Sequence, residues 1–132
     1  MSGADLAEPV RYWLDLARGD LAAARIVSID VNVPPRVAAG LAHQAAEKAL
    51  KALIAFVGSD PPRSHDLVAL ANRATTSVLD VGEDQLRALD DAYAESRYPT
   101  YRGLEYDREE AIALVAVAST IVSQVDRELG QS

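Results

Sequence analysis

The chain has 132 residues, with 13 basic and 20 acidic side chains, and its formal net charge is −7. This charge disfavours a general nucleic-acid-binding surface, because phosphate contacts need clustered Lys and Arg. The length suits a single domain over residues 1–132. The absence of cysteine excludes disulfides, a thiol nucleophile and thiolate metal ligands.

The start of the chain has no apolar signal core, and no apolar run approaches the ~18 residues that a membrane helix needs. We therefore expect a cytoplasmic protein that has no membrane partner. Alanine is abundant and aromatic residues make up only 5% of the chain, which favours closely packed helices over strands.

The first helix is predicted over residues 9–27. Pro9 suits the first turn of a helix, where a missing N–H costs nothing, and apolar residues follow at steps of four and three. The two prolines of the segment DVNVPP, residues 30–35, then break the chain before the second helix.

The second helix is predicted over residues 37–57 and carries both an apolar stripe and a polar face. Alanines at positions 42, 45, 49 and 52 form the stripe, which is typical of a helix packed inside a bundle. The polar residues fall within one arc of the helix: His43, Gln44, Glu47, Lys48 and Lys51.

Two further apolar residues of this helix, Leu50 and Ile54, lie almost directly beneath His43 on the helical projection. The apolar region is therefore wider than one neighbouring layer of a bundle would cover. This width predicts a contact beyond the bundle, and we expect a homodimer.

A short helix is predicted over residues 65–75, with Ser64 as its N-cap. Asp80 and Glu83 have the spacing of a capping box for the third long helix. That helix is expected to stop near residues 96–97, because Pro99 disfavours helical geometry at Tyr98.

The last helix is predicted to begin at a capping box formed by Asp107 and Glu110 and to continue to about residue 129. Four long amphipathic helices joined by short turns favour antiparallel neighbours. The predicted fold is therefore all-α: an up-and-down four-helix bundle with a short additional helix between helices two and three.

Three segments together resemble one family: HQAAEKALKAL at residues 43–53, SHDL at 64–67 and YAESRYP at 93–99. With the pattern W-L-x-x-A-x-x-D-L-x-x-A over residues 13–24, they resemble the HEPN domain (higher eukaryotes and prokaryotes nucleotide-binding domain). The resemblance implies a helical bundle that usually dimerises and binds a nucleotide or RNA. It also implies a minimal nucleotidyltransferase partner in a toxin–antitoxin-like pair.

Many members of that family are metal-independent ribonucleases whose motif is Arg, four to six residues, then His. Arg97 matches the Arg, but residues 102–104 are Arg, Gly and Leu, so the expected His is missing. RNA cleavage of this kind needs a group of near-neutral pKa, which His65 or His43 could supply from another helix. A ribonuclease that uses Arg97 with His65 is therefore an alternative to a binding module, and enzymatic activity stays open.

Arg97 and Lys48 are the candidate phosphate contacts, Arg97 because a guanidinium engages phosphate bidentately. Either cation could instead have a structural role: Arg97 could cap carbonyls or pair with a carboxylate, and Lys48 could belong to the solvated face. Tyr98 and Tyr101 could stack on a base or bind phosphate through their hydroxyls, or pin the loop to the bundle. By analogy with the family, Tyr101 is also a candidate for nucleotidylation.

His43 and Glu47, one helical turn apart, are candidate ligand contacts that could orient one another. Without further ligands beside them, we predict neither a metal site nor a cofactor. Bonding to a neighbouring helix or lining the dimer contact is the alternative for His43, and packing or capping over the second turn is the alternative for His65. If all of these side chains are structural, the chain is a non-catalytic helical adaptor.

Overall fold

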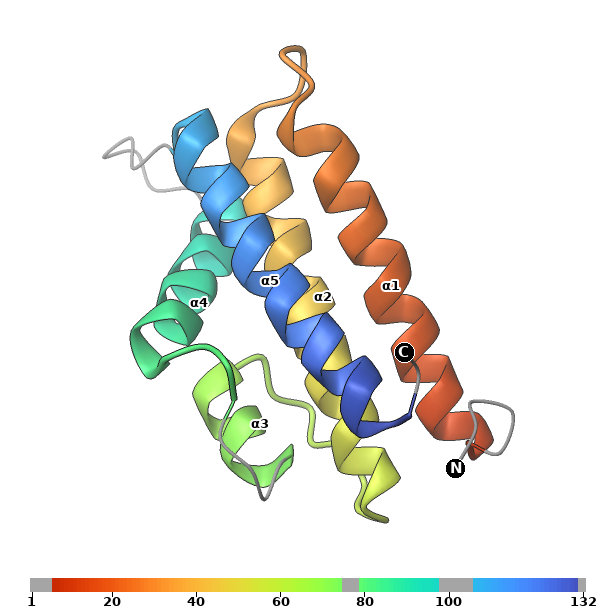
Figure 1. The fold of residues 1–132 in the computed structure, drawn as a ribbon. Helices are drawn as coiled ribbons and strands as arrows, with labels where there is room; N and C mark the ends of the chain where they lie inside the picture. The colour runs from red at the N-terminus through yellow and green to blue at the C-terminus, as the bar shows by residue number, and fades with distance from the viewer. Residues whose placement is uncertain (1–5, 75–78, 98–105, 131–132) are drawn as a thin grey trace.

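The computed structural model describes residues 6–74, 79–97 and 106–130. These residues form five helices and no strand: α1 (Glu8–Ser28), α2 (Pro35–Phe56), α3 (Leu67–Ala74), α4 (Glu83–Arg97) and α5 (Arg108–Glu128). The four long helices alternate in direction along the chain, and short α3 lies beside the end of α2 (Figure 1). The predicted all-α bundle with a short extra helix is confirmed.

Helix α2 is the centre of the bundle and contacts all four of the other helices. Its alanines at positions 38, 42, 45, 49 and 52 have no exposed surface, so neighbouring helices pack closely against them. Leu50 and Ile54 are also 0% exposed. The wide apolar arc of this helix is therefore covered within one chain. The arc gives no support for a homodimer, and the homodimer itself stays a prediction.

The start of α5 has the predicted capping box. The Asp107 carboxylate accepts a hydrogen bond from the Glu110 N–H, and the Glu110 carboxylate accepts one from the Asp107 N–H. The capping box predicted at Asp80 is wrong, because its carboxylate binds Arg127 of α5 at 2.7 Å. At the start of α4, Gly82 instead donates its N–H to the Gln85 side chain.

The short helix begins at Leu67, later than the predicted residue 65, and its capping residue differs from the prediction. Asp66 accepts a hydrogen bond from the Ala69 N–H, so Asp66 is the N-cap. Ser64 accepts from the Asp66 N–H and forms the turn that precedes the helix. Residues 64–66 therefore stay extended enough to lie against α2.

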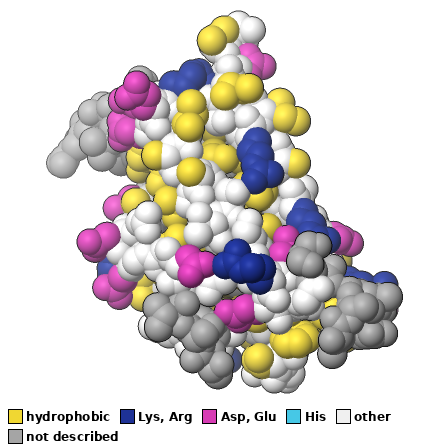
Figure 2. Space-filling model, viewed as in Figure 1, with side chains coloured by type: hydrophobic (Ala, Val, Ile, Leu, Met, Phe, Trp, Pro, Cys, Tyr) yellow, Lys and Arg dark blue, Asp and Glu magenta, His cyan; other side chains and the backbone are white. Residues whose placement is uncertain are grey.

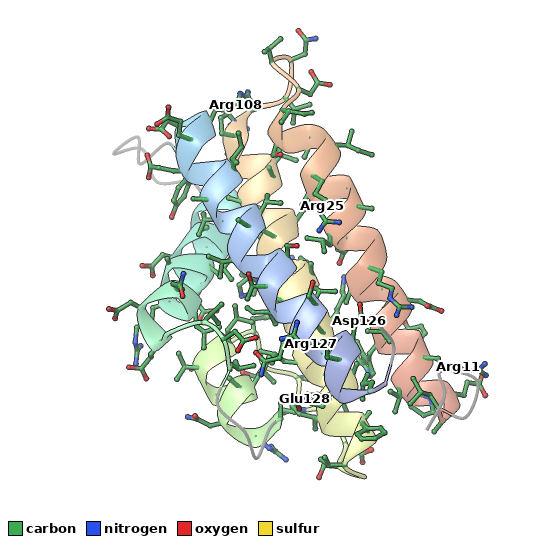
Figure 3. All side chains as sticks on the ribbon, viewed as in Figure 1. Arg11, Arg25, Arg108, Asp126, Arg127 and Glu128 are labelled. Atoms are coloured by element: carbon green, nitrogen blue, oxygen red, sulfur yellow. The ribbon has the colours of Figure 1, made fainter. Side chains whose placement is uncertain are left out.

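Polar contacts fasten α5 to α1 on the face shown in Figures 2 and 3. Arg18 pairs with Asp126 at 2.9 Å, and Arg25 donates to the Ser119 hydroxyl at 2.7 Å. The two α1 residues are seven positions apart, and so are the two α5 residues. Both contacts therefore lie along the same face of each helix. Basic, acidic and hydrophobic side chains are interspersed over this face (Figure 2).

Arg108 at the start of α5 holds the turn between α1 and α2. Its guanidinium donates to the backbone oxygens of Ser28 and Val33, at 2.7 and 2.9 Å. In the same turn, Ile29 and Val31 are 71% and 82% exposed. None of the helices in the described part of the chain has the length and apolarity to cross a membrane.

Candidate functional site

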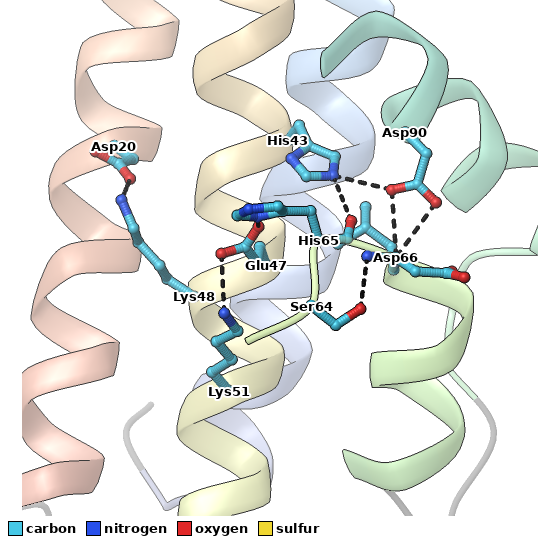
Figure 4. A network of polar contacts seen from close by, with 10 residues as sticks. Asp20, His43, Glu47, Lys48, Lys51, Ser64, His65, Asp66 and Asp90 are labelled. Atoms are coloured by element: carbon cyan, nitrogen blue, oxygen red, sulfur yellow. Dashed lines mark hydrogen bonds and ion pairs between the residues drawn. The ribbon is translucent and has the colours of Figure 1, made fainter. Parts of the chain in front are cut away.

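A group of polar side chains, three of them buried, lies on the side of α2 that faces α4 and the segment before α3 (Figure 4). We call it the polar cluster: His43, Glu47, Lys51, His65 and Asp90. The three α2 members are spaced four residues apart and therefore share one face of the helix. They are at most 6% exposed, although burying polar groups costs free energy unless partners satisfy them.

His43 joins α2 to both neighbouring elements. Its Nε2 lies 2.9 Å from the Asp90 Oδ1 and 3.0 Å from the His65 backbone oxygen (Figure 4). A carbonyl oxygen can only accept, so Nε2 carries the proton and donates to both oxygens. Burial lowers the pKa of His43, against the opposing effect of Asp90, and this favours a neutral ring.

The Asp90 carboxylate fixes the start of α3 as well as the His43 ring. Both of its oxygens lie 3.2 Å from the Leu67 backbone nitrogen, whose N–H they accept. Burial raises the pKa of Asp90, while the hydrogen bonds from His43 and Leu67 act in the opposite direction. Through this one side chain, α4 is bonded to α2 and to the segment before α3.

The Glu47 carboxylate connects an exposed imidazole to a buried ammonium. Its Oε1 lies 2.6 Å from the His65 Nδ1, and its Oε2 lies 3.2 Å from the Lys51 Nζ. The Lys51 ammonium also lies 5.3 Å from the centre of the Trp13 ring of α1. Because a carboxylate accepts, His65 donates from Nδ1, and in the tautomer protonated only on Nδ1 the lone pair is on Nε2.

The side chain of His65 is 58% exposed, in contrast to the 5% exposed carboxylate that holds it. Within the described residues, no hydrogen bond is formed by its Nε2. The arrangement is thus an exposed imidazole that a buried carboxylate orients through Nδ1, which leaves Nε2 as the second ring nitrogen. Such a nitrogen can accept a proton or a hydrogen bond from a bound molecule.

Tyr93 links the polar cluster to Arg97. Its ring stacks on His43 with centroids 4.3 Å apart, and it lies 5.2 Å from the ring of His65. The Arg97 Cζ lies 5.4 Å from the centre of the same ring. A groove of about 320 Å³ beside these residues is lined by Val37, Gly40, Leu41, Gln44, Tyr93 and Arg97.

Comparison with known proteins identifies the family to which this chain belongs. Residues 10–128 match the model of the HEPN domain. The chain belongs to the HEPN family. This result confirms the resemblance inferred from the three sequence segments, and the match covers every helix that contributes to the polar cluster.

Two solved structures are similar to this HEPN chain over most of its length. TT1696 from Thermus thermophilus is 29% identical, with a TM-score of 0.76, covering 92% of this chain and 99% of that one. ST0689, an archaeal HEPN homologue, is 28% identical, with a TM-score of 0.70, covering 93% and 99%. No curated protein sequence matches this chain significantly.

Of the residues predicted for the site, the HEPN fold brings His43, Glu47, His65 and Arg97 to the surroundings of Tyr93. Lys48 lies apart from them, because its ammonium pairs with Asp20 of α1 (Figure 4). Tyr98 and Tyr101 lie outside the described residues.

Sequence reasoning missed Asp90 and the role of Tyr93. A signal was present, because Asp90, Tyr93 and Arg97 step by three and four and so share one face of α4. Among the described residues, His, Asp and Glu side chains do not gather in a group of three or more that could hold a metal ion. The groups gathered around the Tyr93 ring are an imidazole and a guanidinium.

Proposed function

We propose that this HEPN chain is a dimeric module that binds a nucleotide or RNA phosphate at Arg97. We further propose that it acts with a minimal nucleotidyltransferase partner in a toxin–antitoxin-like pair. The observation that carries the proposal is the placement of Arg97 and His65 against one ring, that of Tyr93, beside an open groove.

Each part of this arrangement suits one part of such a ligand. The Arg97 guanidinium can engage phosphate oxygens bidentately, and the Tyr93 ring lies next to it. His65 presents an exposed imidazole on the other side of the cluster. The groove has the size of a small-molecule site, which is typically about 300–1,000 Å³.

The other predicted ligand residues take different parts in the proposal. His43 and Glu47 are buried, so they orient Asp90 and His65 and do not touch the ligand in this conformation. Tyr98 and Tyr101 follow Arg97 in the sequence and remain proposed contacts. Lys48 would have to leave Asp20 to reach a phosphate.

The direct test replaces Arg97 with Ala and measures the affinity for ATP and for a fluorescein-labelled single-stranded RNA. Loss of a hydrogen-bonded charge should weaken binding by about 1.5–3 kcal/mol, which is about 10- to 150-fold. Arg87→Ala is the matched control, because Arg87 lies on the same helix and pairs with Glu83 at 3.4 Å. Equal affinities in the wild type and the Arg97 variant would refute this site.

A ribonuclease is the second candidate, favoured by the exposed imidazole of His65 and by Arg97, both of which approach the ring of Tyr93. The Nε2 lone pair could take the proton of a 2′-hydroxyl while Arg97 stabilises the phosphorane charge. His43 has no exposed surface, so it is the weaker candidate for this step.

Cleavage of labelled RNA in the presence of a chelator tests the ribonuclease. The expected pattern is cleavage by the wild type, with loss of activity in both Arg97→Ala and His65→Ala. Intact RNA after incubation with clean wild-type dimer would exclude the nuclease and leave the binding module. An adaptor without ligand chemistry would neither cleave nor bind the RNA.

We propose the dimer for two reasons. Members of the family usually dimerise, and the groove beside Arg97 exposes an apolar side chain, Val37, which is 38% exposed. A second chain seated there would also bring two copies of Arg97 towards one another. Sedimentation at micromolar concentration tests it, and a monomer would contradict it. Co-purification with a nucleotidyltransferase encoded beside the gene would test the partner.

A further inference from the structure

The segment that carries His65 is bonded to buried side chains at three separate points. The His65 backbone oxygen accepts from His43, the Leu67 N–H donates to Asp90, and the His65 ring donates to Glu47. These bonds come from two different helices, α2 and α4. The position of the imidazole is thereby fixed through the backbone of residues 65 and 67 and through its own Nδ1.

This restraint has a cost that packing alone does not explain. His43 is fully buried, and its Nδ1 has no hydrogen-bond partner among the described residues, so part of its polar surface is desolvated without compensation there. Glu47 is buried as a charged group. The group that these residues hold most directly, the ring of His65, is 58% exposed and contributes little to the core.

The turn between α1 and α2 provides a contrast. It is held to α5 by Arg108, whose guanidinium binds two backbone oxygens, and within residues 6–74, 79–97 and 106–130 no buried carboxylate or imidazole is bonded to it. A connecting segment of this bundle can therefore be fastened without burying polar side chains in the core. The polar cluster is therefore expected to have a role beyond fastening the segment before α3.

We propose that Asp90 and His43 are positioning residues, which act through the backbone of residues 65–67 to keep the His65 ring on Glu47 with its lone pair on Nε2. The inference rests on the proposed function, in which that face of His65 meets the ligand. Nε2 in this form accepts hydrogen bonds, so it suits a hydroxyl of the ligand, whereas Arg97 suits a phosphate. Without the two positioning residues, the His65 ring would rotate. Nε2 would then donate to Glu47, and Nδ1 would carry the lone pair.

The chain has only two histidines, which makes the tautomer directly measurable. The full chain, labelled with ¹⁵N-histidine, gives separate ring-nitrogen signals for His43 and His65 in a long-range proton–nitrogen spectrum. His65→Gln assigns them. In the wild type at pH 8, we expect His65 to be in the form that is protonated on Nδ1.

Asp90→Ala is the test variant, and Asp91→Ala is the matched control, because Asp91 is the next residue on α4 and is exposed. We expect Asp90→Ala to convert His65 to a mixture of tautomers and Asp91→Ala to leave it unchanged. Glu47→Gln keeps an acceptor oxygen but removes its charge, and so shows the effect of weakening the direct bond to Nδ1–H. If Asp90→Ala fails to fold, Asp90→Asn gives the same measurement with a milder change.

An unchanged His65 tautomer in a folded Asp90 variant would overturn the inference, even if stability falls. A parallel titration with labelled RNA separates this failure from that of the proposed function. We expect the affinity for RNA to fall by about tenfold in Asp90→Ala. Replacing a hydrogen-bond partner that orients a functional histidine often has an effect of this size. A shifted tautomer with no RNA binding by the wild type would support the positioning role and refute the proposed function.

Discussion

Helix α2 carries two ion pairs within one turn, and their surroundings differ. At its contact with α1, Lys48 and Asp20 have side chains that are 20% and 25% exposed. Beneath residues 64–66, Lys51 and Glu47 have side chains that are only 7% and 5% exposed. We call them the outer pair and the inner pair. If one charge of the outer pair is removed, water can hydrate the other. If one charge of the inner pair is removed, the other stays buried without compensation.

The largest expected effect comes from breaking the inner pair. Glu47→Leu leaves the Lys51 ammonium buried without its carboxylate and should lower the free energy of unfolding by about 3–5 kcal/mol. Urea denaturation measures this loss. The double variant Glu47→Leu/Lys51→Met removes both charges and should recover most of the stability. Equal losses in the single and double variants would contradict the role of the unpaired charge.

The second effect is a loss of stability in acid that originates at His43. Its pKa is lowered by burial from an ordinary value of 6.5, so the unfolded chain takes up the proton first as the pH falls. The free energy of unfolding should therefore begin to fall near pH 6.5 and continue to fall until the lower pKa of the folded state is passed. The slope should reach at most about 1.4 kcal/mol per pH unit for one proton.

Asp90 acts in the opposite sense at the acid end. Its raised pKa means that the folded chain binds this proton more tightly than the unfolded one, which offsets part of the loss as the carboxyl titrates. Denaturation of the wild type, His43→Gln and His65→Gln at pH 7.5 and 5.5 checks the assignment. The pH dependence should shrink in the His43 variant and persist in the His65 variant. The reverse pattern would show that the other histidine is responsible.

The smallest effect is expected at the outer pair. Asp20→Ala should cost about 0–1 kcal/mol, and the cost should shrink at high salt, because both groups are partly hydrated. RNA affinity should not fall, because Lys48 and Asp20 lie at the contact between α2 and α1, away from His43 and Asp90 (Figure 4). Asp15→Ala, an exposed carboxylate on the same helix, is the control. A loss comparable to that of Glu47→Leu would abolish the distinction between the two pairs.

Features set by near neighbours in the chain were predictable from the sequence. Proline positions and apolar spacing located the long helices, and the box of Asp107 and Glu110 marked the start of α5. The expected box at Asp80 failed because Arg127, 47 residues away, takes its carboxylate. Local spacing cannot show such a competitor.

The same limit applies to the site. The polar face of α2 identified His43 and Glu47, and the family resemblance identified His65 and Arg97. The partner of His43, however, is Asp90, which is 47 residues away on α4. Helical periodicity shows which residues share a face but not which segment covers that face. For this reason the arc of Leu50 and Ile54 suggested a second chain where α2's own neighbours cover it.

The contact between Lys51 and Trp13 provides a natural optical reporter. Trp13 is the only tryptophan in the chain, and its ring lies 5.3 Å from an ammonium that is bound to Glu47. A ligand that draws His65 away from Glu47 would change how that carboxylate holds Lys51, and hence the electric field at the indole. Unlabelled wild-type protein should then signal events at His65 through the wavelength of its own fluorescence.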